Sequence, residues 1–437
     1  MRNRIITAVG LCLLTVVMLT VPALKMLGSF PTEVTLFQGE EQPFDFDLPW
    51  GIELSDKGLQ DMAGKLDDML FDTTEIGSYD LSLKFMGILP MGNLRVTVIP
   101  PLELMPSGHS IAVKLSDEGV LVSGLDAVYT EAGAIELARE SGFQEGDIIV
   151  AVEGKPLVNI EQSAAVLDEL SQSGEELEFS VLRDGETIRL RIQPEYCQQL
   201  KKNRLGLLLR DTTAGVGTMT FYHPESGIYG ALGHMITDGS GNQPVDLKSG
   251  RIVDAEIIAI EPGARGKPGE KKGTVDAEQQ SLGSINFNTE LGIFGHLSRT
   301  PEKNVQQALP LGLRHQVKTG KAEILTVVKG DKIERFEIEI EKVFIQNQPS
   351  SKGMVIRVTD VRLLEATGGI VQGMSGSPII QEGKLVGAVT HVFINEPDRG
   401  YGCFAEWMVI ESGLLSELES ALPPDYLEAL IYNLQDI

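Results

Sequence analysis

The sequence predicts a mainly β protein of several domains, preceded by one apolar helix. The chain has 437 residues, enough for about three domains, and 42% of them are hydrophobic, enough for separate cores. Much of the chain has short apolar runs broken by glycine and proline, of which there are 47 and 21, a pattern typical of strands and turns. From residue 201 onward, few segments before Trp407 have the spacing of a long helix.

An uncharged apolar segment follows Arg2 and Arg4 at the start of the chain. It runs from residue 5 to residue 24, about 20 residues, which is long enough to span the hydrocarbon core of a membrane. Positive charge before such a segment keeps the N-terminus in the cytoplasm, so the rest of the chain should face outward. We therefore expect residues 1–26 to form an uncleaved membrane anchor. A cleaved signal peptide is the alternative, because VPA at residues 21–23 weakly resembles a cleavage site.

Residues 33–100 contain short apolar alternations, such as VTLF at 34–37 and LRVTVI at 94–99. These runs predict the strands of a small β-domain. The acidic stretch at 67–72 lacks the spacing of a calcium-binding loop and is interpreted as a solvated face. Two consecutive prolines at 100–101 mark the end of this domain.

Charge and cysteine content exclude several functions. The formal net charge of −25 at pH 7 argues against binding to nucleic acid and against a peripheral hold on anionic lipid. Cys12, Cys197 and Cys403 lie far apart and form no C-x-x-C pair. We therefore expect no metal site, no cofactor, and two free, buried thiols at Cys197 and Cys403. A single bridge between these two is the alternative.

Residues 105–194 resemble a PDZ domain. The resemblance is carried by GFQEGDIIVAVEGKPL at 142–157, by helical spacing at 162–171 and by an alternating strand at 177–181. It implies that the loop 106–111 presents backbone N–H groups to a peptide C-terminus, although this loop lacks the usual Gly-Leu-Gly-Phe form. The alternative is a PDZ-shaped spacer that captures no peptide. The implied peptide-binding residues are Ser107, Gly108, His109, Ser110 and Ile111.

Two strings in the last domain, residues 201–437, point to a serine protease. Ser375 lies in GMSGSP at 373–378, where glycines permit a tight turn that points backbone N–H groups at one place. His234 lies far upstream, in GHMITD at 233–238. Because a serine hydroxyl is a weak nucleophile, a neutral imidazole must accept its proton, and we choose His234 as this base. His296 has a similar context in GIFGHL at 292–297 and is the competing base.

The other histidines and the remaining segments have plainer interpretations. His109, His223 and His315 lack such a context and are interpreted as structural or exposed, whereas His391 could line a pocket. Residues 261–273 predict a mobile basic loop, which either admits substrate or is a solvated hairpin tip. Residues 414–434 have helical spacing that two prolines interrupt, which predicts two short helices.

The whole chain resembles the stage IV sporulation protein B serine peptidases, which join an anchor, a PDZ domain and a chymotrypsin-like double β-barrel. The motifs are the PDZ string above, YGALGHMITD at 229–238 and IVQGMSGSP at 370–378. The resemblance implies His234 as general base and Ser375 as nucleophile, with the N–H groups of Gly373 and Ser375 forming the oxyanion hole. Asp360 resembles the acidic member of the triad.

The position of Asp360 leaves alternatives open for the triad acid. It lies unusually close to Ser375 in sequence, whereas trypsin-like enzymes place this aspartate nearer the middle of the catalytic domain. Asp238, Asp246 and Asp254 therefore remain candidates, and Asp360 has the alternative role of capping a turn.

The resemblance also implies a biological role in sporulation. It implies an enzyme tethered in the forespore membrane and facing the space between the two spore membranes. It further implies self-cleavage near the anchor and cleavage of a membrane regulatory protein that restrains another protease. A noncatalytic PDZ scaffold with a degenerate protease domain is the alternative function, against which the intact His234 and Ser375 motifs argue.

Overall fold

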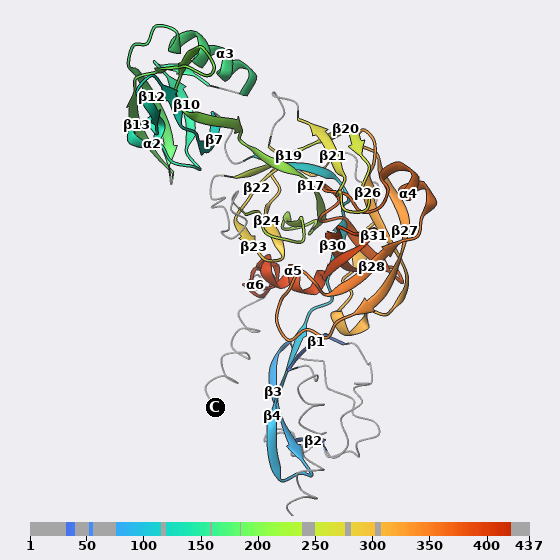
Figure 1. The fold of residues 1–437 in the computed structure, drawn as a ribbon. Helices are drawn as coiled ribbons and strands as arrows, with labels where there is room; N and C mark the ends of the chain where they lie inside the picture. Colours follow the sequence, from blue (N-terminus) through green and yellow to red (C-terminus); the bar gives the residue numbers. More distant parts are fainter. Residues whose placement is uncertain are drawn as a thin grey trace, which may run out of the picture.

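The computed structural model describes residues 32–39, 52–55, 76–114, 119–157, 160–183, 185–237, 250–275, 281–301 and 307–420. The fold is mainly β, as predicted, and its strands form three groups along the molecule (Figure 1). We call them the N-terminal sheet, the central unit and the inserted unit. Within the described ranges no helix has the length and apolarity needed to cross a membrane. The expected anchor at residues 1–26 lies outside those ranges, as does the acidic stretch at 67–72.

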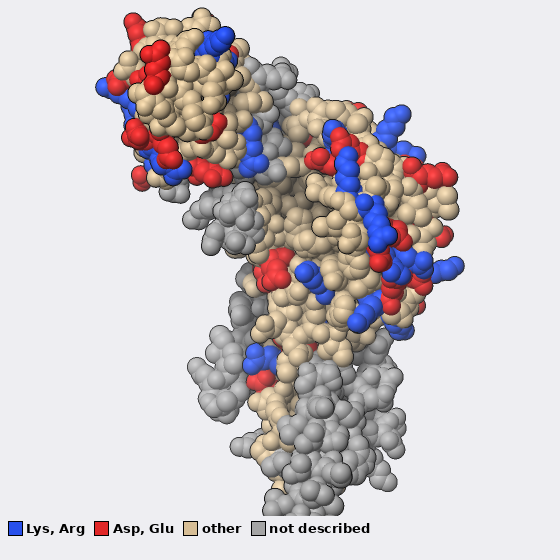
Figure 2. Space-filling view, viewed as in Figure 1, with Lys and Arg blue, Asp and Glu red and all other residues tan. Residues whose placement is uncertain are grey.

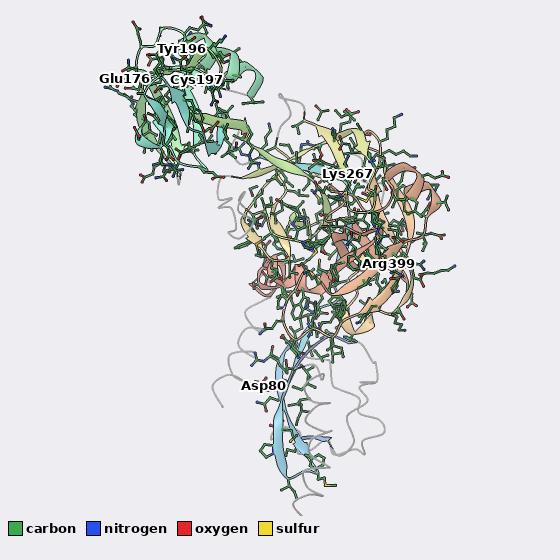
Figure 3. The ribbon with its side chains drawn as sticks, in the orientation of Figure 1. Asp80, Glu176, Tyr196, Cys197, Lys267 and Arg399 are labelled. Atoms are coloured by element: carbon green, nitrogen blue, oxygen red, sulfur yellow. The ribbon has the colours of Figure 1, made fainter. Side chains whose placement is uncertain are left out.

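The N-terminal sheet has four strands in the order β1-β4-β3-β2. Strand β1 runs parallel to β4, and the other neighbours are antiparallel. The long β3–β4 hairpin extends away from the central unit, and Figure 3 labels Asp80 on it. The strands are β1 (Glu33–Phe37), β2 (Ile52–Ser55), β3 (Gly77–Phe85) and β4 (Leu89–Ile99).

The first half of the central unit is a nine-stranded sheet. Its main path runs β22-β19-β6-β17-β18-β24-β23, with β5 and β25 attached beside β17. The strands are β5 (Glu103–Pro106), β6 (Ser110–Lys114), β17 (Thr213–Tyr222), β18 (Ile228–Ala231), β19 (Arg251–Asp254), β22 (Gly283–Ser284), β23 (Phe287–Thr289), β24 (Gly292–His296) and β25 (Leu309–Pro310). A separate hairpin, β20 (Glu256–Glu261) with β21 (Glu270–Thr274), follows β19.

The second half of the central unit is a closed six-stranded barrel in the order β26-β27-β28-β31-β30-β29. The strands are β26 (Gly320–Val327), β27 (Ile333–Val343), β28 (Met354–Val358), β29 (Pro378–Gln381), β30 (Lys384–Phe393) and β31 (Glu396–Phe404). The helical segments are η1 (Arg314–Gln316), α4 (Val361–Thr367), α5 (Ala405–Glu411) and α6 (Leu414–Ser420). The predicted pair of barrels is therefore observed as one closed barrel and, among the described strands, one sheet that is not closed.

One continuous hydrophobic core joins the two halves of the central unit. Phe221 and Phe294 of the first sheet belong to the same buried cluster as Ile324 and Met374 of the barrel side. Figure 2 shows acidic and basic side chains mixed over the barrel surface, where Arg399 forms ion pairs with glutamates. Most charged residues of the barrel therefore lie at the surface, and the apolar cluster holds the two halves together.

The inserted unit interrupts the first sheet between β6 and β17 and has a hydrophobic core of its own. Its sheet has the order β13-β12-β10-β7-β16, with β11 beside β10. The elements are β7 (Val120–Leu125), β8 (Val128–Thr130), β9 (Gly133–Ile135), α2 (Leu137–Glu140), β10 (Ile148–Val152), β11 (Lys155–Pro156), α3 (Ile160–Ser171), β12 (Leu177–Arg183), β13 (Glu186–Ile192), β14 (Glu195–Cys197), β15 (Lys202–Arg204) and β16 (Leu207–Asp211). The helix predicted at 162–171 and the strand at 177–181 are present.

The strand pairing corrects the predicted domain boundaries. A PDZ-like domain was expected over 105–194, and a peptidase domain over 201–437. Strands β5 and β6, however, pair with β17, so residues 103–114 belong to the central unit. The inserted unit instead continues to β16, which pairs with β7. The chain thus leaves the central unit after β6 and returns to it at β17.

The two described cysteines lie in different units. Cys197 is in the inserted unit, as labelled in Figure 3, and Cys403 is in β31 of the barrel. Both are buried and free, which agrees with the prediction of two separate thiols.

Candidate active site

Ser375 lies in a tight turn directly before β29. Gly373 and Gly376 have φ values of 93° and 92°, a region that favours glycine. A Cβ atom on Gly376 would lie 2.0 Å from the Thr218 carbonyl oxygen and 2.5 Å from the Leu232 amide nitrogen. The turn therefore requires glycine at this position, because strand β17 and the end of β18 press directly against it.

The carbonyl groups of this turn are hydrogen-bonded to strand β17, and two of its amide groups are left for a ligand. The Gly373 carbonyl accepts a hydrogen bond from Thr218 Oγ1 at 2.8 Å, and the Ser375 carbonyl accepts one from the Thr218 amide at 2.9 Å. Thr220 Oγ1 similarly donates to the Gly376 carbonyl at 2.8 Å. In the part of the chain that the structure describes, the amides of Gly373 and Ser375 donate to no protein acceptor. Two nearby amides available to a ligand are what an oxyanion hole requires.

His234 follows a sharp bend at the end of β18. Leu232 and Gly233 both have positive φ values, 72° and 70°. Nδ1 of His234 lies 2.9 Å from the Met235 carbonyl oxygen. Because a carbonyl only accepts, Nδ1 carries the proton of the neutral ring, and Nε2 is left as a proton acceptor. Burial lowers the pKa of His234, and the Met235 carbonyl opposes this only in part, so the ring is neutral at neutral pH.

Thr390 of β30 lies between the serine and histidine segments. Ser375 Oγ donates to the Thr390 carbonyl at 2.8 Å, and a Cβ atom on Gly233 would lie 2.9 Å from Thr390 Cγ2. The structure thus brings the two predicted motifs together. His234 and Ser375 are not hydrogen-bonded to each other in this arrangement, as far as the described residues show. Such bonds often form only when substrate is present, and rotation of the Ser375 side chain would release its hydroxyl.

His391 lines the same site beside His234. The two ring centroids are 5.1 Å apart, and the rings are inclined by 39°. Partial burial lowers the pKa of His391 to about 4, and the nearby His234 and Lys352 add to this effect. Two neutral imidazoles therefore lie side by side at neutral pH.

The structure places Asp360 at the N-terminus of α4 and not beside His234. Its carboxylate accepts hydrogen bonds from the Arg362 amide at 2.9 Å, from Arg362 Nη2 at 2.7 Å and from the Glu337 amide at 3.3 Å. These contacts lower the pKa of Asp360, with the Arg362 guanidinium as the main cause. The expected triad role is corrected to that of a helix cap, because Arg362 and the first turn of α4 take up both carboxylate oxygens.

Of the alternative acids, the one within the described residues is not brought to His234 either. Asp254 forms an ion pair with Arg299. Asp238 and Asp246 lie outside the described residues. Within the described part of the chain, the hydrogen bond that orients the His234 ring is the one to the Met235 carbonyl.

His296 differs from His234 in its surroundings. The two similar strings lie on neighbouring strands, since β18 and β24 pair in antiparallel fashion. His296 Nε2 lies 3.4 Å from Glu417 Oε2, and its side chain is half exposed. His296 is therefore a surface residue, and no contact links it to the serine turn within the described ranges.

The loop expected to capture a peptide lies inside the first sheet of the central unit. The amides of Ser107 and Gly108 donate to the carbonyls of Thr220 and Met219, each at 2.9 Å. These donors are therefore already used by β17 and cannot receive a peptide carboxylate. The prediction of a peptide-binding loop is therefore corrected for Ser107, Gly108, His109, Ser110 and Ile111. The last two of these residues begin β6.

The residues that hold the serine turn in place were not predicted from the sequence. Thr218 and Thr220 alternate on β17, so both face the turn. Lys271 falls in the predicted mobile basic loop at 261–273, but it is only 2% exposed. The alternation of threonines in the sequence was the signal that could have revealed Thr218 and Thr220.

Among the described residues, no group of His, Cys, Asp and Glu could hold a metal ion.

A serine on a glycine turn with two available amides, next to a buried neutral imidazole, defines the central unit as a serine peptidase. The family comparison agrees. Residues 201–409 match the family model described as SpoIVB peptidase S55. The protein is accordingly a serine endopeptidase. A comparison with curated proteins finds no match.

Several solved structures are weakly similar to this chain. The active form of the Rv3671c protease from M. tuberculosis is 15% identical over 46% of this chain and 73% of its own, with a TM-score of 0.25. A mutant of human heparin binding protein is 14% identical over 48% and 88%, with a TM-score of 0.28. The HtrA-type protease AlgW with decapeptide is 15% identical over 48% and 54%, with a TM-score of 0.26. The assignment depends on the family match and the site, and not on these likenesses.

Proposed function

We propose that this peptidase is a membrane-tethered, self-cleaving signalling enzyme of sporulation with Ser375 as nucleophile and His234 as general base. The observation that carries the catalytic part is the turn whose Gly373 and Ser375 amides have no protein acceptor among the described residues. The match to the SpoIVB peptidase S55 family supports the sporulation part.

The geometry suits acyl transfer. Ser375 Oγ leaves the Thr390 carbonyl and attacks the scissile carbonyl carbon, while His234 Nε2 accepts the hydroxyl proton. The negative charge that develops on the substrate oxygen is stabilised by the Gly373 and Ser375 amides. His234 then donates the proton to the leaving amine. In the second half of the reaction, His234 accepts a proton from the water that attacks the acyl-enzyme and returns it to Ser375 Oγ.

Variants of the full chain test these roles. Ser375→Ala and His234→Ala should each abolish self-cleavage and reaction with a fluorophosphonate, whereas the matched control His296→Ala should retain both. Mapping new N-termini in the wild type would locate the cleaved bonds. Cleavage by purified Ser375→Ala, or a loss confined to His296→Ala, would contradict the assignment.

The tether, the substrate and the location belong to the same proposal. The apolar segment at 5–24 supports an anchor, and the family supports a forespore enzyme that faces the space between the two spore membranes. Its substrates would be its own chain near the anchor and a membrane regulatory protein that restrains another protease. Fractionation of sporulating cells with an antibody to the central unit tests the location, and release of the protein by a high-salt wash would contradict an anchor.

We further propose that the inserted unit is PDZ-like and binds an extended peptide along β16. Within the described strands, β16 is the end strand of its sheet, and α3 lies beside it. Gly206 precedes β16 with a φ of 75°, between the buried Leu205 and Leu207. The string LGL at 205–207 resembles the last three positions of Gly-Leu-Gly-Phe. An end strand next to a helix is the geometry in which PDZ domains add a peptide strand.

Leu208 offers a test of peptide capture, because it lies on β16 and lines a cavity of about 480 Å³ with Phe143 and Arg139. Leu208→Lys should slow cleavage of a protein substrate with an intact C-terminal tail and leave cleavage of a short peptide unchanged. Tyr129→Lys, at a similarly exposed position of the same unit, is the control. Equal effects of both variants on both substrates would contradict capture along β16.

A further inference from the structure

A buried lysine lies directly beneath the serine turn. Lys271 belongs to β21, and its side chain is 2% exposed. The hairpin β20–β21 places it against the residues that precede Ser375, since the Lys271 amide donates to the Gln372 carbonyl at 2.9 Å. A lysine is rarely buried without an acidic partner, so its presence here requires a reason.

The head of Lys271 is hydrogen-bonded to one hydroxyl, and within the described ranges it forms no ion pair with a carboxylate. Nζ donates to Thr326 Oγ1 at 2.7 Å, and Thr326 Oγ1 lies 3.1 Å from Ser377 Oγ. Thr326 and Ser377 are completely buried. The three side chains therefore form a hydrogen-bonded chain that reaches from the β20–β21 hairpin through β26 to the residue two positions after Ser375.

The stem of Lys271 supports the other end of the same turn. A Cβ atom on Gly373 would lie 3.0 Å from Lys271 Cβ and 3.2 Å from its Cδ. Gly373 is thus packed against the methylene groups of Lys271. Lys271 therefore contacts Gly373 directly and is linked to Ser377 through Thr326.

We propose that Lys271 is a positioning residue of the peptidase: its stem fixes Gly373, and its head, through Thr326, fixes Ser377, so that the Gly373 and Ser375 amides point at one oxygen. This inference rests on the proposed function. Burial lowers the pKa of Lys271 to about 7, so a neutral amine can fill this place without a counter-ion. Lys271 touches no substrate and acts through the turn alone.

Two variants separate positioning from simple support of the fold. Lys271→Met keeps most of the stem and removes the head, and Thr326→Val removes the linking hydroxyl at nearly constant volume. Lys272→Met is the matched control, because Lys272 is exposed and pairs with Glu261 at the surface. Turnover of a short peptide is measured per active site, with active sites counted by fluorophosphonate titration, so that unfolded protein does not lower the value.

We expect Lys271→Met and Thr326→Val to lower kcat about 10- to 100-fold with KM within about twofold, because misplaced oxyanion donors act on the transition state. Lys272→Met should match the wild type. A kcat within about twofold of wild type in both test variants would overturn the proposal, and if Lys271→Met does not fold, Thr326→Val decides.

A second measurement does not depend on catalysis. In a Ser375→Ala background, amide hydrogen exchange of a peptide covering 370–378 should be faster with Lys271→Met than with Lys272→Met. If the wild type cleaves nothing, the proposed function fails, and this measurement still decides the role of Lys271. Equal exchange in the two variants would show that Lys271 does not fix the turn.

Discussion

His234 should keep the peptidase active at lower pH than an exposed histidine would. Burial lowers its pKa from the usual value of about 6.5, so the ring stays neutral and able to accept a proton as the pH falls through that value. We expect the acidic midpoint of kcat/KM, which reports the free enzyme, to lie below pH 6.5. The measurement is a pH profile with an uncharged peptide substrate. An acidic midpoint at or above 6.5 would show that the base is more exposed or paired with an acid.

Asp360 should tolerate replacement by asparagine. Asparagine caps helices as well as aspartate does, so Asp360→Asn should keep the unfolding free energy within about 1 kcal/mol of the wild type. Turnover should stay within about tenfold, because the carboxylate is bonded to Arg362 and Glu337 and not to His234. Peptide turnover and urea unfolding check both values. A loss near four orders of magnitude in a folded variant would restore Asp360 as the triad acid.

The sequence predicted some of the site residues because their requirements are local. The glycines around Ser375 and the glycine before His234 can be recognised in the adjacent sequence. Lys271 left no such pattern, because its burial depends on contacts with Thr326 and Gly373, which lie far away in the chain. Asp360 was misassigned for a related reason: the arginine two residues later, and not a distant histidine, determines its contacts.

At the scale of elements, the insertion should be removable. Lys114 of β6 and Thr213 of β17 are paired neighbours across adjacent strands, so a two-residue Asn-Gly turn can join them as a hairpin. A chain that lacks the inserted unit should fold and cleave a short peptide at a rate within a few-fold of the intact enzyme. Circular dichroism and peptide turnover are the measurements. An unfolded product would mean that the inserted unit also stabilises the central unit.

The same pairing explains why the domain boundaries were misjudged. The alternating pattern of β12 and the helical spacing of α3 are visible in the local sequence, and those elements were predicted correctly. The partners of β6 are β17 and β19, which follow it only after the whole inserted unit. A strand whose partners are so distant carries no local sign of the sheet to which it belongs, so residues 105–114 were assigned to the unit that follows them.

At the scale of the whole molecule, a buried ion pair connects the N-terminal sheet to the central unit. Arg314 Nη1 lies 2.9 Å from Glu406 Oε1, and the same oxygen accepts a hydrogen bond from Thr35 Oγ1 at 2.6 Å. Thr35 lies in β1, whereas Glu406 lies in α5 directly after the barrel. The Arg314 guanidinium also stacks over Trp407 and donates to the Glu33 carbonyl. This network therefore holds β1 on the face of the peptidase.

Glu406→Gln should weaken that connection strongly. The variant leaves the Arg314 charge buried without a counter-ion, which typically costs about 3–5 kcal/mol. We expect a loss of this size in urea unfolding and faster proteolytic release of the segment that contains β1. Glu396→Gln is the matched control, because Glu396 pairs with Arg399 at the surface, where an ion pair contributes about 1 kcal/mol or less.

A second change separates the buried charge from the lost contact. Adding Arg314→Met to Glu406→Gln removes the uncompensated charge and should recover part of the unfolding free energy, since apolar replacements of buried pairs are often well tolerated. The segment with β1 should still be released faster, because Thr35 and the Glu33 carbonyl have lost their partners. If the double variant is no more stable than Glu406→Gln, the cost comes from packing around α5 and not from the unpaired arginine.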